Sequence, residues 1–203
     1  RRTNSLPRAR EAFTAEQIRF DRWTLKVAQR ELIGEDGVAT PLSTAEFHNL
    51  VGKYIAAKAV YKRQVLELGG NDPIIVMDDA DIEEAATLAA SGSYKNSGQR
   101  CTAVKRMLVH QAVADDFVER LVAKTRAVKY GDPLDAATDM GTVIDEAAAV
   151  EFERRVNDAV QSGARLLAGN ERRGALYSPT VLDLVQPGMR LVKEETFGPV
   201  SPV

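Results

Sequence analysis

The sequence has a single cysteine and only two histidines among its 203 residues. One cysteine cannot form an internal disulfide, so Cys101 is either a buried small hydrophobic residue or a working thiol in a reducing compartment. The histidines, His48 and His110, do not stand at a metal-ligand spacing, and we interpret both as structural or exposed. We therefore expect no metal site.

Long apolar runs and a strong net charge are also lacking. No stretch approaches the roughly 18 apolar residues of a membrane span, and the basic start Arg1–Asn4 is not followed by the apolar segment of a signal peptide. The net charge of −2 gives no reason to expect a nucleic-acid or membrane partner. With 44% hydrophobic and 28% charged residues, the chain has the composition of a soluble globular protein, which we expect to be cytoplasmic.

The chain changes character near residue 50. Residues 1–30 are rich in Lys and Arg, which indicates an exposed linker. Short alternating runs around a Gly-containing turn then predict a hairpin, and Ser43 or Thr44 with Glu46 can begin a helix as a capping box. Residues 18–50 resemble the start of the winged-helix domain of response regulators. No recognition helix follows, so we expect no DNA binding.

From residue 51 the pattern predicts alternating helices and strands, and hence an α/β fold with a mostly parallel sheet covered by helices. We place the domain boundary between residues 1–50 and 51–203. Helices are expected at 51–59, from Asp79 or Asp81 to about 89, at 115–128 and at 146–162, and strands at 64–68, 73–77, 105–110 and 164–167.

Two residues carry the chemistry that the pattern indicates. Cys101 follows a Gly-containing bend and precedes an expected helix start, where free backbone N–H groups can stabilise a thiolate. Glu67 ends an apolar strand, where partial desolvation favours a proton acceptor. A nucleophile and a base are the minimum for acyl chemistry. The alternative for Glu67 is an ordinary surface carboxylate.

Three phrases resemble the aldehyde dehydrogenase superfamily in their order and approximate separation. They are Glu67-Leu68-Gly69-Gly70, Gly98-Gln99-Arg100-Cys101 and Glu195-Thr196-Phe197-Gly198-Pro199-Val200. The resemblance covers residues 51–203 and implies the three-layer catalytic domain of that family, with a mostly parallel sheet and incomplete at both ends.

The same resemblance implies a role for four residues. Cys101 attacks the aldehyde carbon, and loss of a hydride to NAD or NADP leaves a thioester. Glu67 then activates the water that releases the carboxylic acid. Glu195 accepts hydrogen bonds from the nicotinamide ribose, and Phe197 packs near the nicotinamide ring. The alternative for Glu195 is a solvated charge.

Arg100 is the substrate clue in the sequence. A guanidinium directly before the nucleophile offers a bidentate grip for a phosphate or phosphonate. Residues 98–106 are similar to two branches of the superfamily, non-phosphorylating glyceraldehyde-3-phosphate dehydrogenase and phosphonoacetaldehyde dehydrogenase, and Asn71 favours the second. The alternative is that Arg100 and Arg106 are surface or helix-end charges.

The sequence departs from the family pattern at both ends. We expect the cofactor pocket to be half missing, because residues 1–50 do not resemble the family's dinucleotide-binding domain. We also expect an exposed sheet edge and uncovered apolar faces. The complete enzyme is expected to be a homo-oligomer. Three hypotheses follow: an aldehyde-oxidising segment, a regulator-derived DNA-binding fusion joined near Leu50, and a non-catalytic fragment that keeps the fold.

Overall fold

The computed structural model describes residues 17–20, 23–26, 29, 31–42, 44–59 and 61–203. The chain forms two compact units, Arg1–Phe47 and His48–Val203. All three family-like phrases lie in the second unit. The boundary predicted at residue 50 lies inside helix α1 (Thr44–Ala59).

The first unit contains an antiparallel sheet in the order β1-β2-β3-β4. Its strands are β1 (Gln17–Phe20), β2 (Trp23–Lys26), β3 (Glu31–Ile33) and β4 (Ala39–Pro41). The expected Gly-containing turn joins β3 to β4, where Gly37 has a φ of 74° and donates its N–H to the Gly34 carbonyl at 3.0 Å. Leu25 is buried. Ser43, one of the two predicted capping residues, lies outside the described residues.

The second unit mixes helices and strands after α1, as predicted, although α4 follows α3 directly and β7 to β10 are consecutive strands. The elements are β5 (Asp72–Val76), α2 (Ile82–Tyr94), the 3-10 helix η1 (Lys95–Gly98), β6 (Val104–Val109), η2 (Gln111–Val113), α3 (Ala114–Ala127), α4 (Glu146–Gln161), β7 (Arg165–Ala168), β8 (Arg172–Arg173), β9 (Leu176–Tyr177), β10 (Thr180–Asp183), α5 (Arg190–Lys193) and β11 (Val200–Pro202). Of the two predicted caps of α2, Asp81 is the one used: its side chain accepts a hydrogen bond from the Glu84 N–H at 3.0 Å.

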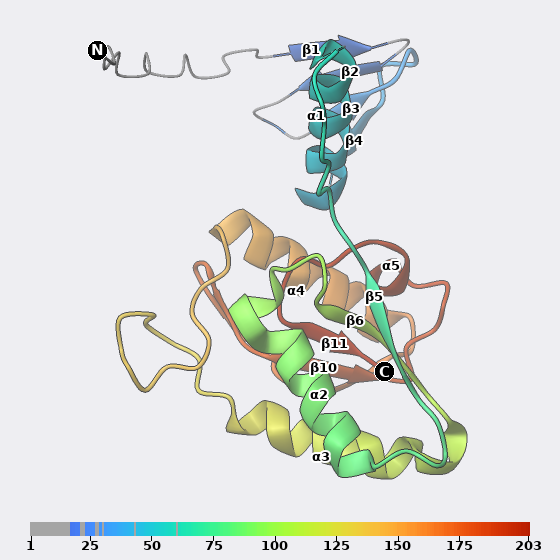
Figure 1. Ribbon diagram of the computed structural model, residues 1–203, viewed down its shortest axis with the longest axis vertical. Coiled ribbons are helices and arrows are strands. Elements are labelled where there is room, and N and C mark those ends of the chain that lie inside the picture. The colour runs from blue at the N-terminus through green and yellow to red at the C-terminus, as the bar shows by residue number, and fades with distance from the viewer. Residues whose placement is uncertain (1–16, 21–22, 27–28, 30, 43, 60) are drawn as a thin grey trace, which may run out of the picture. The chain divides into compact units, whose positions relative to one another are not determined.

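The second unit is a three-layer α/β structure. β5 pairs with β6 and β10 pairs with β11 in parallel, while β7 joins β10 antiparallel. Helices α2 and α3 lie on one side of the strands and α4 on the other (Figure 1). The strands have a hydrophobic core on each face. Successive side chains of β10 point to opposite faces, so that Val181 packs with α2 and α3 whereas Leu182 packs with α4. The fold class predicted from the alternation is confirmed.

The strand predicted at residues 64–68 is wrong. Residues 63–71 have no regular secondary structure. Val65 and Leu66 are 84% and 50% exposed, and no described strand pairs with this segment. A strand needs a neighbour for its backbone hydrogen bonds, so apolar sequence alone does not form one.

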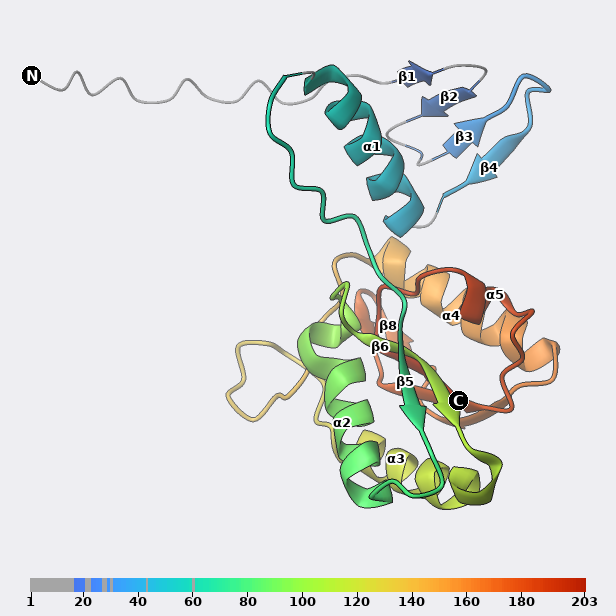
Figure 2. The same ribbon diagram turned by 45° about the vertical axis from the view of Figure 1, so that its right-hand side comes forward.

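Part of the apolar surface is uncovered, as expected. Ile75 of β5 and Leu108 of β6 are direct partners across the parallel pair, and they are 64% and 56% exposed. Figure 2 shows the two strands side by side. Among the described residues, no helix is long and apolar enough to cross a membrane.

Candidate active site

The candidate nucleophile follows a tight left-handed turn. After α2, three consecutive residues have positive φ angles: Asn96 at 57°, Ser97 at 55° and Gly98 at 67°. Two of them are not glycine, and such backbone persists only where its surroundings hold it. At Gly98 a Cβ would overlap the Gly198 carbonyl oxygen, so only glycine fits there.

Contacts with a distant loop hold this turn in place. Ser97 directs its hydroxyl to the carbonyls of Gly141 and Thr142, at 3.1 and 3.2 Å. The side-chain oxygen of Gln99 accepts the N–H of Ile144 at 2.8 Å. Because Ser97 within the turn and Gln99 directly after it are hydrogen-bonded to residues 141–144, the backbone that leads to Cys101 is fixed.

The helix expected directly after Cys101 is wrong. Cys101 lies in a turn that leads into strand β6, and it is a free, half-buried thiol. A helix start therefore does not supply the N–H groups that the sequence argument used to stabilise a thiolate. Gly70, the second residue of the glycine pair before β5, contacts the Cys101 backbone instead.

Gly70 packs directly on the backbone of Cys101. A Cβ at Gly70 would overlap the Cys101 carbonyl oxygen and lie 2.9 Å from its carbonyl carbon. This closeness follows from the strand order, because β5 and β6 are parallel neighbours that pair Asp72 with Val104, and the two motifs directly precede them. A glycine here is explained by the close approach of two backbones.

The same glycine pair also contacts the third motif, which precedes β11. The Gly70 N–H donates to Glu195 Oε1 at 3.0 Å, and a Cβ at Gly69 would lie 2.6 Å from Glu195 Oε2. Gly69 has a φ of 143°, in the region that favours glycine. The structure thus brings the glycine pair, Cys101 and the Glu195 carboxylate together, although they are far apart in the sequence.

Glu67 does not occupy the environment that was predicted for it. Its side chain is exposed, and the strand that should have ended there is absent. Among the described residues, no hydrogen bond joins Glu67 to Cys101. The desolvation argument for Glu67 as a base therefore fails in this arrangement, and the role rests on the family resemblance of the phrase Glu67-Leu68-Gly69-Gly70.

Buried charges surround the Glu195 carboxylate. Burial raises its pKa above the ordinary value, against the Gly70 N–H and the charges of Lys105 and Arg155, which lower it; Asp72 raises it further. Lys105 is 2% exposed and donates to the Gly198 carbonyl. Burial lowers the pKa of Lys105 to about 7, with Glu195 opposing and Arg100 adding to the shift.

The other two predicted site residues differ in their surroundings. Phe197 is partly exposed within the Glu195 motif. Arg100 donates from Nη2 to the Gly92 carbonyl of α2 at 2.9 Å, and its Nε is buried with no partner among the described groups. This contact favours the helix-end interpretation of Arg100 over a grip on substrate.

Sequence reasoning missed two residues near the site, the buried cations Lys105 and Arg155. One signal was present for Arg155, which follows Phe152 by three residues on the apolar stripe of α4. Lys105 had no such local signal, because its partner Gly198 is distant in the sequence. Asn71, which the sequence analysis used as a substrate clue, donates from Nδ2 to the Val192 carbonyl at 2.9 Å.

In this three-layer α/β unit, Gly70 thus packs on the backbone of a free cysteine, and its N–H holds a half-buried carboxylate. The aldehyde dehydrogenase family model matches residues 47–203, and the chain belongs to that family. The matched segment begins one residue before the second compact unit. The resemblance of residues 18–50 to response regulators has no support from this match, and it stays a prediction.

Individual relatives agree with the family assignment. The chain is 44% identical over 149 residues to a sulfoacetaldehyde dehydrogenase of Neptuniibacter caesariensis, which covers 73% of this chain and 33% of the relative. It is similar to the structure of a glyceraldehyde-3-phosphate dehydrogenase of Methanocaldococcus jannaschii complexed with NADP, with a TM-score of 0.72, 41% identity, and coverage of 75% of this chain and 33% of the other.

A third relative is an NAD-dependent aldehyde dehydrogenase from Sinorhizobium meliloti, with a TM-score of 0.71 and 42% identity, covering 78% of this chain and 32% of the other. The chain thus spans about a third of the length of these relatives.

Proposed function

We propose that this chain carries the nucleophile segment of an NAD(P)-dependent aldehyde dehydrogenase, with Cys101 as the nucleophile. The observation that carries the proposal is the packing of Gly70 on the Cys101 backbone while its N–H holds Glu195. The Cys101 backbone and the Glu195 carboxylate therefore both contact Gly70, which supports a shared site. The family membership supplies the reaction class.

In the proposed reaction the Cys101 thiolate adds to the aldehyde carbon and forms a thiohemiacetal. A bound nicotinamide cofactor would supply the acceptor for the hydride on that carbon, and loss of this hydride together with the hydroxyl proton would leave a thioester on Cys101. Glu67 takes a proton from water as the water attacks the thioester carbonyl. The carboxylic acid leaves, and the sulfur returns as thiolate.

The residues present fit the ribose end of such a cofactor. The carboxylate of Glu195 is half-buried. It lies close to the backbone of Gly69 and Gly70, and a Cβ atom at Gly69 would block this approach. An ionised carboxylate accepts hydrogen bonds from hydroxyl groups. We propose that Glu195 holds the nicotinamide ribose of NAD or NADP, with Phe197 beside the ring.

We propose a small aldehyde that bears an anionic group as the substrate, with phosphonoacetaldehyde as the first choice. Two of the relatives act on sulfoacetaldehyde and on glyceraldehyde 3-phosphate, which both carry such a group. Arg100 is the proposed grip in the sequence, although its contact with Gly92 supports the helix-end alternative.

The test is reduction of NAD or NADP, followed by absorbance, with phosphonoacetaldehyde, glyceraldehyde 3-phosphate and an uncharged aldehyde of similar size. Where NAD or NADP binds, the proposal predicts oxidation of the anionic aldehydes, loss of this oxidation in Cys101→Ala and slow release of the thioester in Glu67→Gln. Equal rates with the uncharged aldehyde, unchanged in Arg100→Gln, would remove the anionic-substrate part.

A second candidate is a segment that keeps the fold without turnover. The exposure of Glu67, and the lack of a hydrogen bond from it to Cys101 among the described residues, favour this candidate. A folded chain that forms a stable thioester on Cys101 but never releases acid would support it over the first proposal.

A further inference from the structure

Arg155 of α4 is a fully buried charge that contacts the backbone of Glu195. Its side chain is 1% exposed, and a buried guanidinium is stable only when its donors are paired. Nε donates to Glu151 Oε1 at 2.8 Å and Nη2 to Glu194 Oε2 at 2.9 Å. The charge is therefore balanced by two carboxylates.

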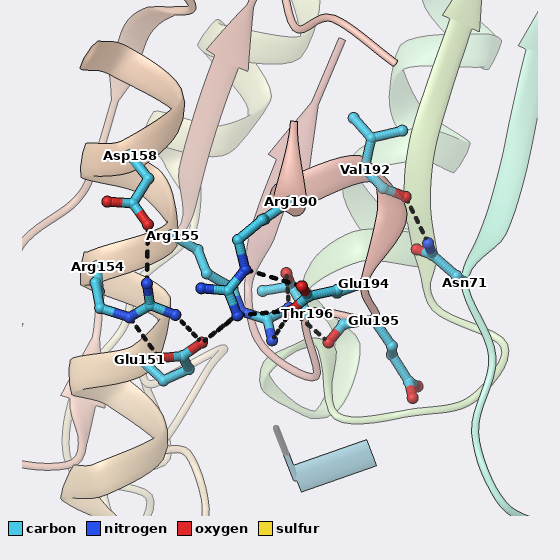
Figure 3. A network of polar contacts seen from close by, with 10 residues as sticks. All are labelled: Asn71, Glu151, Arg154, Arg155, Asp158, Arg190, Val192, Glu194, Glu195 and Thr196. Atoms are coloured by element: carbon cyan, nitrogen blue, oxygen red, sulfur yellow. Dashed lines mark hydrogen bonds and ion pairs between the residues drawn. The ribbon is translucent and has the colours of Figure 1, made fainter. Parts of the chain in front are cut away.

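The remaining nitrogen of Arg155 contacts the cofactor motif itself. Nη1 donates to the Glu195 carbonyl at 3.0 Å and lies 3.4 Å from Thr196 Oγ1. Figure 3 shows Arg155 reaching from α4 to this segment, while the Glu195 carboxylate points away from the network. Arg155 thus holds the main chain of Glu195 on the side opposite to the carboxylate.

Other contacts fix the same short segment. The Gly70 N–H holds the Glu195 carboxylate at 3.0 Å, and Lys105 donates to the Gly198 carbonyl. The main chain and the side chain of Glu195 are therefore held by different elements, α4 and the glycine pair. The position of the Glu195 main chain therefore determines whether its carboxylate can reach Gly70.

The adjacent Arg154 offers a matched comparison on the same helix. It is 43% exposed and pairs with Glu151 and Asp158, both on α4. It shares the charge, the helix and one partner with Arg155, but its ion pairs stay within α4. A change at Arg154 therefore tests loss of an arginine from α4 without loss of the contact to Glu195.

We propose that Arg155 is a positioning residue, which holds the backbone of residues 194–196 so that the Glu195 carboxylate meets the Gly69–Gly70 pair beside Cys101. This proposal rests on the proposed function, in which Glu195 holds the ribose of the cofactor. Its structural content, an effect of Arg155 on the carboxylate at Gly70, does not depend on turnover.

The experiment follows the Gly70 amide by ¹⁵N NMR as a function of pH in the full chain, because its N–H reports the ionisation of the carboxylate that it contacts. Glu195→Gln identifies the signal by abolishing its titration. The groups that face Glu195 are Lys105, Arg155, Asp72 and the Gly70 N–H. Arg155→Met, Arg155→Lys and Arg154→Met are compared with the unaltered chain.

In Arg155→Met we expect the Gly70 titration to move to higher pH or to be lost, because a cation that lowers the Glu195 pKa is gone and the main chain is released. Arg154→Met keeps the original titration. Arg155→Lys restores the charge and the midpoint, with a smaller change in amide shift because an ammonium cannot make all the guanidinium contacts.

An Arg155→Met chain that is folded and titrates at Gly70 as the unaltered chain does would overturn the proposal. If Arg155→Met does not fold, Arg155→Lys decides, and a titration identical in midpoint and amplitude overturns it. Failure of the proposed function appears separately, as absence of aldehyde oxidation with the Gly70 titration intact.

Discussion

Replacing Gly70 by alanine changes the site at the point where two motifs meet. The added Cβ overlaps the Cys101 carbonyl oxygen and lies 2.9 Å from its carbonyl carbon. The atoms in conflict belong to backbone, so no side-chain rotation relieves the overlap. Gly70 is not among the glycines with positive φ, and its conformation itself accepts alanine. The effect is therefore steric and local to Cys101.

The magnitude follows from the displacement that the overlap demands. The Cys101 backbone has to move by about an ångström to restore van der Waals contact, which is typical of overpacking that destabilises by about 1–3 kcal/mol. A misplacement of about this size lowers reaction rates on the order of 100-fold. In Gly70→Ala we therefore expect the free energy of unfolding to fall by about 1–3 kcal/mol. We also expect acylation of Cys101 to slow on the order of 100-fold.

The assay combines urea unfolding with the rate of Cys101 acylation by p-nitrophenyl acetate, which requires no nicotinamide. Gly188→Ala is the matched control, because its Cβ meets nothing within 4 Å and its φ is not positive. The control should change stability by less than about 0.5 kcal/mol. A Gly70→Ala chain with unaltered stability and acylation rate would refute the packing of Gly70 on Cys101.

Two further predictions concern the core around the Glu195 motif. Lys105→Met should be more stable than the unaltered chain, and this advantage should shrink as pH rises from about 7 to about 10. The reason is that burial lowers the pKa of the folded lysine to about 7, while the unfolded lysine loses its proton near pH 10. A difference in unfolding free energy that does not vary with pH contradicts this. Phe152→Ala should lower the free energy of unfolding by about 3–5 kcal/mol, since Phe152 is 5% exposed, packs edge-on against Tyr177 and fills the space at Gly198. A loss below about 1 kcal/mol in denaturant titration would show that this ring is not in the core.

Local sequence signals predicted the helices and several strands of the second unit. The apolar stripe of α4 and the Asp81 cap of α2 depend on residues within a few positions of each other, which is why the pattern reveals them. The same local signals failed at residues 64–68, where the apolar run lacks a neighbouring strand. Strand formation is decided by a distant partner, which no local pattern contains.

The candidate site also contains features that the sequence indicated and features that only the fold shows. The order of the three phrases, through a family resemblance, indicated which residues belong together, and the structure joins Gly70 to Glu195 across 125 positions. The burial of Arg155 depends on Glu194 and on the Glu195 backbone, about 40 positions away. Such charges are recognised only once the fold places their partners.

The central claim is that Cys101 is an assembled nucleophile, and the most direct test is the intact mass of the chain after brief exposure to p-nitrophenyl acetate. We predict one acetyl group on the unaltered chain, none on Cys101→Ala, and a longer-lived adduct on Glu67→Gln. A folded sample in which the unaltered chain gains no acetyl group, or gains it equally after Cys101→Ala, would contradict the claim.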